Sequence, residues 1–298
     1  MSLKNKFRLM PVLLVLLPLW LVCSGAFALF KNFKNEKAVA IEEQQRFSQS
    51  VSSVSIADDL RKIITVIGER NTAKTEKLAA TASMIRGTLG LANTGYEVKT
   101  LASPSDAPIV QASLLSEKSD AAPIWVIASY DSPPGSRGGE KNASGLVASL
   151  AAAQALADSK PARPVHFIYL PHANDPDAPV LETIALLRKM IVESTAPKAI
   201  LCVEAMGDAE TLMLTSRDTE AVPATAFHGL GEVVGAEVAC LGDDYDLAST
   251  LFEMDLPALR IATRPTLLPD EEDEKIPFAP TLAASTGRLI ELIQRLSR

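Results

Sequence analysis

The hydrophobic and polar positions of this chain divide it into three zones. Residues 9–30 form an apolar run of 22 residues that contains no charged side chain. Residues 31–55 are polar, with a charged, glutamine-containing first half and a serine-rich second half. From residue 56 onward, short apolar runs alternate with amphipathic segments of helical period. This alternation predicts an α/β domain over 56–298, with three layers: a mostly parallel central sheet and helices on both faces.

Within the 56–298 domain, the pattern predicts two helices first and then strands and helices in turn. The helices are expected at 60–67, 75–89, 146–157, 179–192, 222–234, 248–254 and 281–296. The strands are expected at 96–101, 110–115, 124–128, 165–170, 199–203, 211–215 and 256–261. The chain shows no internal repeat, so a solenoid or propeller is not expected.

The apolar run 9–30 is long enough to cross a bilayer as a helix, and residues 1–8 form a short tail before it. Two interpretations are open: an uncleaved signal anchor, and a signal peptide cleaved after the small-x-small sequence 26–28. The length of the run favours the anchor. Lysines lie on both sides of it, so the positive-inside rule sets its orientation only weakly. We expect a single-pass membrane protein with a stalk over 31–55 and an extracytoplasmic main domain, in a bacterial periplasm or a secretory pathway.

Composition and cysteine content narrow the function classes further. The net charge is −7, the pI is about 5.2 and aromatic residues make up 5% of the chain, so no nucleic-acid partner is expected. There are three cysteines: Cys23 lies in the apolar run, while Cys202 and Cys240 lie in the main domain. Whether those two pair is open, and two buried free thiols are the commoner outcome. The spacing does not suggest a thiolate zinc site.

The most informative stretch runs from residue 124 to residue 145. An apolar run ends in Ser129-Tyr130-Asp131 and is followed by a loop rich in proline and glycine. The loop ends in Lys141-Asn142-Ala143-Ser144-Gly145, which leads into a helix rich in alanine and leucine. Strand, loop and helix form the first half of a crossover unit. Loops at the carboxyl ends of parallel strands are where α/β proteins place their functional sites.

This stretch resembles the metal-binding core of the co-catalytic zinc aminopeptidases, whose non-enzymatic relatives include the transferrin receptor ectodomain and nicastrin. In that family the strand ends in His-x-Asp and the loop ends in Asp-Asn-x-Ser-Gly. Gly68-Glu69-Arg70 is similar to the Gly-x-Arg element near the start of the family's domain. The resemblance implies a zinc-exopeptidase fold over 56–298. In active members it also implies two zinc ions and a glutamate that acts as general base.

The resemblance places the metal ligands and the base at positions where this chain has mostly lost them. The first histidine ligand falls at Ser129, and the bridging aspartate falls at Lys141, whose ammonium has no lone pair. The pair of glutamates, base and then ligand, falls at Ala173 and Asn174. The fourth ligand is kept as a carboxylate at Glu204.

Two further positions complete the family's frame. Asp131, which in the family orients the first histidine, is kept, while the last histidine falls near Ala248. Zinc requires His, carboxylate or thiolate donors, so Glu204 alone does not hold two ions. We therefore expect no metal, no other cofactor and no catalytic residue, which defines a pseudo-peptidase. Such a membrane-anchored domain would bind a protein or peptide partner, or act as a scaffold in an envelope complex. The alternative is an active zinc aminopeptidase with displaced ligands.

Three hypotheses concern single side chains at this site. In the first, the ammonium of Lys141 replaces the metal and pairs with Asp131 and Glu204, whose buried charges need compensation. The alternative is that these residues have drifted in an unused site. In the second, Lys141 activates Ser129 as a nucleophile, although no oxyanion hole is recognisable. In the third, His172 binds a metal, whereas a satisfied core histidine is the simpler interpretation.

Overall fold

The structure is a computed structural model, and it describes residues 20, 23–31, 51–116, 120–216, 236–240, 246–256, 258–265 and 273–298. Two compact units divide the chain, Met1–Phe47 and Ser48–Arg298. In the first unit, residues 23–31 are helical, and most of the predicted 9–30 membrane segment lies outside the described residues. Among the described residues, no helix combines the length and the apolar character that a bilayer span requires. The tail, anchor and stalk at 1–8, 9–30 and 31–55 stay predictions.

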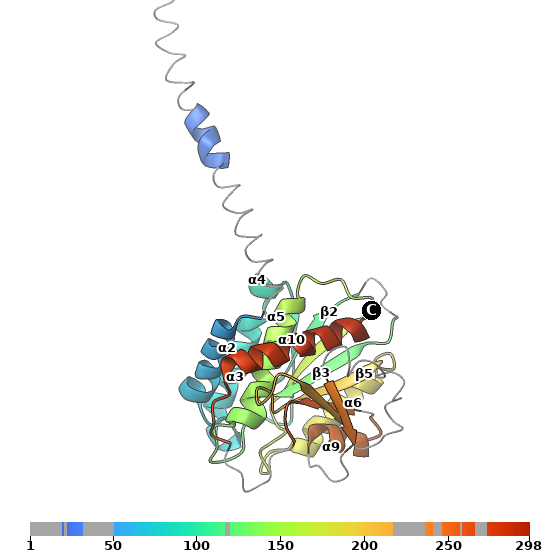
Figure 1. Cartoon of the computed structure of the whole chain (residues 1–298). Helices are drawn as coiled ribbons and strands as arrows, with labels where there is room; N and C mark the ends of the chain where they lie inside the picture. The colour runs from blue at the N-terminus through green and yellow to red at the C-terminus, as the bar shows by residue number, and fades with distance from the viewer. Residues whose placement is uncertain are drawn as a thin grey trace, which may run out of the picture. The chain divides into compact units, whose positions relative to one another are not determined.

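The second unit is organised around a single sheet (Figure 1). In the described part of the chain its strands are β1 (Val98–Leu101), β2 (Ile109–Leu114), β3 (Ile124–Ser129), β4 (Val165–Leu170), β5 (Ala199–Val203), β6 (Leu212–Ser216), β7 (Ala236–Cys240) and β8 (Ala258–Ala262). Their order across the sheet is β1-β2-β4-β3-β5-β8-β6-β7. Strand β7 was not among the strands that the sequence pattern predicts, while the other seven correspond to predicted strands.

The sheet is mixed: in the described part of the chain four strand pairs are parallel and three are antiparallel, so the predicted mostly parallel arrangement is found in part. The four central strands β4, β3, β5 and β8 run parallel to one another. The pairs β1–β2, β2–β4 and β6–β8 are antiparallel, and β6–β7 is parallel. The connection between β1 and β2, residues 102–108, is too short for a crossover helix, so these two strands form an antiparallel pair. The predicted parallel arrangement therefore holds for the centre of the sheet and for the β6–β7 pair at one edge.

Helices cover both faces of the sheet, as the sequence predicts. They are α2 (Ser53–Leu60), η1 (Arg61–Ile67), η2 (Thr72–Lys74), α3 (Thr75–Thr88), α4 (Leu91–Thr94), η3 (Gly139–Ala143), α5 (Ser144–Leu156), α6 (Val180–Val192), α9 (Leu247–Glu253) and α10 (Ala279–Leu296). The predicted helix at 222–234 lies outside the described residues.

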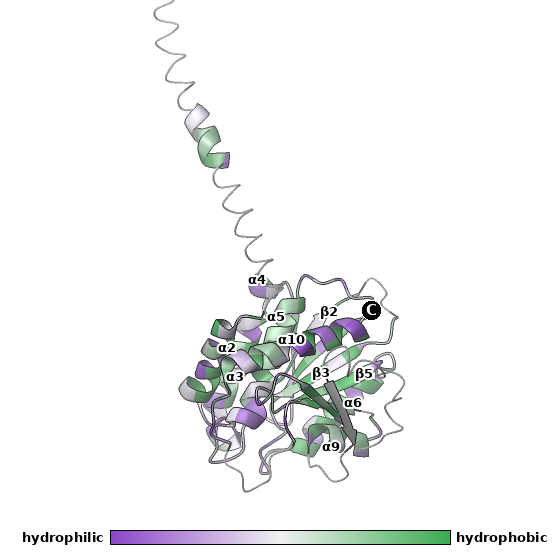
Figure 2. Ribbon diagram, viewed as in Figure 1, coloured by the Kyte–Doolittle hydropathy of each residue, from purple (hydrophilic) through white to green (hydrophobic). Residues whose placement is uncertain are grey.

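Two apolar clusters, one on each face, hold the layers together. Alternate residues of β3 belong to different clusters: Val126 belongs to the cluster that includes residues of α2, α3, α5 and α10, whereas Trp125 and Ile127 belong to the cluster that includes residues of α6 and α9. All three side chains are buried, as expected for a strand covered on both faces. The hydrophobic colouring of β3 and β5 in Figure 2 reflects this two-sided burial. Cys202, in β5, is a buried free thiol.

The start of α5 packs directly against the end of β5, which brings two parts of the predicted site together. A Cβ atom at Gly145 would lie 2.5 Å from the carbonyl oxygen of Val203, closer than van der Waals contact allows. The glycine of the Asn-x-Ser-Gly sequence is therefore required by this close approach. The backbone N–H of Ala205 donates to the carbonyl oxygen of Lys141 at 2.9 Å, which joins the segment before α5 to the residue after Glu204.

Candidate functional site

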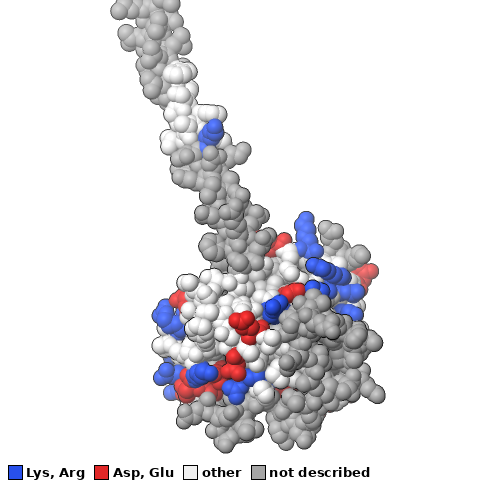
Figure 3. Space-filling model, viewed as in Figure 1, with Lys and Arg blue, Asp and Glu red and all other residues white. Residues whose placement is uncertain are grey.

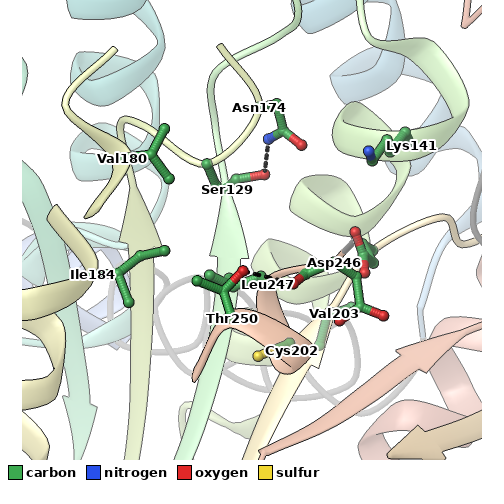
Figure 4. Close-up of a pocket in the computed structure, with 12 residues that line it drawn as sticks. Ser129, Lys141, Asn174, Val180, Ile184, Cys202, Val203, Asp246, Leu247 and Thr250 are labelled. Atoms are coloured by element: carbon green, nitrogen blue, oxygen red, sulfur yellow. Dashed lines mark hydrogen bonds between the residues drawn. The ribbon is translucent and has the colours of Figure 1, made fainter. Parts of the chain in front are cut away.

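A cavity of about 220 Å³ lies beyond the carboxyl ends of β3, β4 and β5 (Figure 4). Five of the positions taken from the aminopeptidase frame line it: Ser129, Lys141, Ala173, Asn174 and Glu204. They come from three strand ends and from the segment before α5, which are far apart in the sequence. The structure thus brings these five predicted positions together, at the edge of the sheet where α/β proteins place their sites.

The other two predicted positions lie outside the lining of this cavity. Ala248 is buried in the apolar cluster beneath α6 and α9. At that end of the site the residues that face the cavity are Asp246 and Leu247 instead. Asp246 caps α9, because its side chain accepts a hydrogen bond from the backbone N–H of Ser249 at 2.7 Å.

Asp131 is fully buried and organises the loop that follows β4. Its Oδ2 atom accepts hydrogen bonds from the backbone N–H groups of Ala173 (2.9 Å), Asn174 (2.8 Å) and Asp175 (3.2 Å). Its Oδ1 atom accepts from Nδ2 of Asn174 at 2.9 Å. Burial raises the pKa of Asp131, while these hydrogen bonds act to lower it. In the family this carboxylate orients a metal ligand. Here Asp131 fixes the loop of residues 173–175, which contains Asn174.

Ser129 is the acceptor in two amide hydrogen bonds. Its Oγ accepts from Nδ2 of Asn174 at 2.8 Å and from Nδ2 of Asn142 at 3.3 Å. Lys141 makes no hydrogen bond to this hydroxyl. The geometry of a Ser-Lys nucleophile pair, in which the lysine takes the proton of the serine, is therefore absent between these two described residues.

Glu204 pairs with Arg260, a residue that the sequence analysis did not single out. Nε of Arg260 lies 2.8 Å from Oε1 of Glu204 and 3.9 Å from Oδ2 of Asp246. The Arg260 side chain is 1% exposed, and its Nη1 also donates to the carbonyl oxygen of Arg264 at 3.0 Å. Burial raises the pKa of Glu204, the Arg260 charge lowers it and the Asp246 charge raises it. An arginine inside the apolar strand Leu259–Ile261 was the available signal, because a buried charge requires a partner.

Lys141 lines the same cavity as Glu204. Its position corrects the first hypothesis, in which its ammonium pairs with Asp131 and Glu204. Its charge lowers the pKa of Glu204, yet among the described residues no carboxylate oxygen lies within 4.0 Å of its Nζ. Asp131 accepts from N–H donors and Glu204 pairs directly with Arg260, so neither carboxylate forms an ion pair with the lysine. Figure 4 shows the Lys141 nitrogen on the side that faces Ser129 and Asn174.

Arg70 fixes the loop between β3 and α5 through hydrogen bonds to backbone carbonyl groups. Its guanidinium is fully buried and donates to the carbonyl oxygens of Tyr130 (2.8 Å), Gly68 (3.0 Å) and Arg137 (2.6 Å). Burial lowers the pKa of Arg70 to about 10, so the group stays charged at neutral pH. The Gly68-Glu69-Arg70 element therefore has a structural role in positioning the loop that carries Lys141.

The side chains at this cavity do not fit a pair of zinc ions. Of the family's donor places only Glu204 is a carboxylate. Asp246 lies outside those places, and both carboxylates face Arg260. In the parts of the chain that the structure describes, no three His, Cys, Asp or Glu side chains are grouped so as to hold a metal. His172 is buried, and its Nε2 is hydrogen-bonded to Oγ of Ser105 at 2.5 Å. Its Nδ1 is buried without a hydrogen-bond partner, so the interpretation as a satisfied core histidine holds for one ring nitrogen only.

The fold is that of the zinc-dependent aminopeptidases and exopeptidases and of the glutaminyl cyclases, at low sequence identity. The Legionella pneumophila aminopeptidase LapA shares 14% identity at a TM-score of 0.66, with 86% of this chain and 74% of LapA covered. A glutaminyl cyclase from Bacteroides thetaiotaomicron shares 15% identity at a TM-score of 0.62, with 82% and 98% covered. A zinc-dependent exopeptidase from Parabacteroides distasonis shares 13% identity at a TM-score of 0.61, with 82% and 98% covered.

No family model and no curated protein sequence matches this chain. The similarity to solved structures confirms the fold that the sequence resemblance implied. It does not assign an activity, because one fold hosts many functions and the site decides among them.

Proposed function

We propose that this protein is a non-catalytic member of the zinc-exopeptidase fold, tethered to a membrane by residues 9–30. In this proposal its cavity binds part of a peptide or protein partner without hydrolysing it. The observation that carries the proposal is the loss of most metal donors, together with protein cations at one donor place and beside the donor that is kept. Lys141 stands at the place of the bridging aspartate, and Arg260 lies at hydrogen-bonding distance from Glu204, the one ligand carboxylate that is kept. Positive side chains at these places repel a divalent cation.

An activity assay tests the catalytic half of the proposal. We expect the purified full chain to cleave aminoacyl anilides no faster than buffer does, with or without added zinc, because Asn174 and Ala173 supply no general base. A matched Glu204→Gln variant distinguishes this site from a contaminating peptidase. Zinc-dependent cleavage that Glu204→Gln abolishes would contradict the proposal and favour an active aminopeptidase with displaced ligands.

Membrane fractionation tests the other half. We expect the full chain to sediment with membranes and to resist extraction by carbonate or high salt, because 22 uncharged residues at 9–30 suffice to cross a bilayer. A chain that begins at residue 48, the start of the second compact unit, serves as the control and should stay in the soluble fraction. Among the described residues on the face drawn in Figure 3, basic and acidic side chains lie close together. Recovery of the full chain from the soluble fraction would contradict the anchor.

A further inference from the structure

The cavity contains one cation, Lys141, that has no ion-pair contact among the described residues, although its charge acts at longer range on Glu204 and Asp273. Glu204 and Asp246 both face the single cation Arg260, at 2.8 and 3.9 Å, so its direct ion-pair contact is with Glu204. Lys141 lines the same cavity without a carboxylate within 4.0 Å of its ammonium. It is half-buried, so a ligand beside it would be partly shielded from water. A ligand that reaches Lys141 can therefore satisfy it with a negative charge.

The Ser129 hydroxyl also favours a ligand with a hydrogen-bond acceptor. A hydroxyl has one donor hydrogen and two acceptor lone pairs. Both acceptor positions of Ser129 are used by the amide donors of Asn174 and Asn142. What remains for a ligand is the donor hydrogen, and Ser129 lines the cavity together with Lys141. Two donors, one of them charged, match the two oxygens of a carboxylate.

The opposite part of the lining is apolar and sets the size of the rest of the ligand. Val180 and Ile184 of α6 and Leu247 of α9 face the cavity. Its volume of about 220 Å³ is comparable to that of about seven water molecules. This space suits a carboxylate that carries a short branched alkyl group. A ligand with a long alkyl chain would exceed the cavity volume.

We infer that this cavity binds a carboxylate bearing a small branched apolar group, with the carboxylate at Lys141 and Ser129 and the alkyl group against Val180 and Ile184. Two sources share this chemistry: a free short-chain acid and the carboxyl-terminal residue of a peptide. The inference rests on the proposed non-catalytic function and names the group that such a binding domain recognises. Such a cavity would recognise a negatively charged group of the ligand and not an amino terminus, because the cation belongs to the protein.

Three isosteric probes test the inference by NMR titration on the full chain. They are 4-methylpentanoate, its neutral amide and 3-methylbutylamine, which share the branched alkyl group and differ in charge. We expect the acid to bind with a Kd of about 1 mM, and the amide to bind roughly tenfold more weakly because it lacks the charge-assisted bond. Tighter binding of the amine than of the acid, or equal binding of acid and amide, would overturn the inference.

Substitutions assign the binding to these side chains. Lys141→Met should weaken binding of the acid roughly tenfold and leave binding of the amide unchanged. Lys160→Met removes an exposed lysine outside the cavity lining and should have no effect on either. Ser129→Ala, which removes only the hydroxyl, should weaken the acid severalfold and provides an independent test if Lys141→Met is unstable. Unchanged binding of the acid in both variants would overturn the assignment.

A peptide pair distinguishes the two sources. Acetyl-Ala-Ala-Leu with a free carboxyl end and the same peptide with an amidated end are titrated in the same way. Tighter binding of the free-ended peptide than of 4-methylpentanoate supports a peptide carboxyl terminus, and weaker binding supports a free acid. Cleavage of the unacetylated peptide Ala-Ala-Leu in the presence of zinc would contradict the proposed function. If that peptide is not cleaved and 4-methylpentanoate does not bind, only this inference is contradicted.

Discussion

Replacing Arg260 by methionine is expected to lower the free energy of unfolding by about 3–5 kcal/mol, the cost of leaving a buried charge without its partner. The Arg260 side chain is 1% exposed and is the ion-pair partner of Glu204 at 2.8 Å. Methionine fills a similar volume, so the loss should arise from the uncompensated carboxylates and not from a cavity. Urea unfolding of the full chain, followed by tryptophan fluorescence, measures the effect.

The pH dependence of the same variant separates charge from packing. Burial already raises the pKa of Glu204, and loss of Arg260 removes the first of the influences that lower it. A carboxyl whose pKa is raised in the folded state contributes stability that is present at low pH and is lost as the pH rises through that pKa. The deficit of Arg260→Met should therefore shrink as the pH is lowered from neutrality. Glu204→Gln in the Arg260→Met background should restore part of the stability, and a deficit insensitive to both changes would contradict the ion-pair account.

Replacing Asp131 by alanine is expected to cost a similar amount, about 3–5 kcal/mol, because several buried donors lose their acceptor at once. The three backbone N–H groups of residues 173–175 and the Asn174 amide all point at this carboxylate. Hydrogen exchange should also become faster at these three amides. Urea unfolding combined with exchange mass spectrometry of the 171–178 segment gives both values.

Two substitutions serve as controls for that result. Asp131→Asn keeps one acceptor oxygen and should cost roughly half as much as alanine. Asp106→Ala removes an exposed carboxylate and should change the stability by no more than about 0.5 kcal/mol. A loss below about 1 kcal/mol for Asp131→Ala, or unchanged exchange at residues 173–175, would show that this carboxylate does not hold the loop.

The hydrophobic pattern was sufficient to predict the centre of this fold but not its edges. The run at 124–128 is apolar on both faces, and it became β3, covered by helices on both sides. Whether an edge strand runs parallel or antiparallel depends on connection length and on pairing partners far along the chain, which periodicity does not encode. For this reason β1 and β2 were found as strands while their antiparallel pairing was not predicted.

At the site, the sequence was informative where a residue sits directly after a strand and uninformative where charges pair across the sheet. Ser129, Asn174 and Glu204 each follow a predicted strand, and the structure places all three at one cavity. The partner of Glu204 was assigned to Lys141 because only residues within the family's frame were considered. Arg260 comes from β8, the strand next to β5, and its guanidinium reaches Glu204 because the two strands are neighbours in the sheet. Only the strand order makes that pair evident.

The most direct test of the account is the zinc content of the full chain after incubation with excess zinc and desalting, measured by plasma mass spectrometry. A restored variant with Ser129→His, Lys141→Asp and Asn174→Glu provides the matched comparison, since it recovers three donors beside Glu204 and Asp246. The account predicts about 0.1 zinc ion per chain or less for the natural sequence and clearly more for the restored variant. About two zinc ions per chain in the natural protein would contradict it.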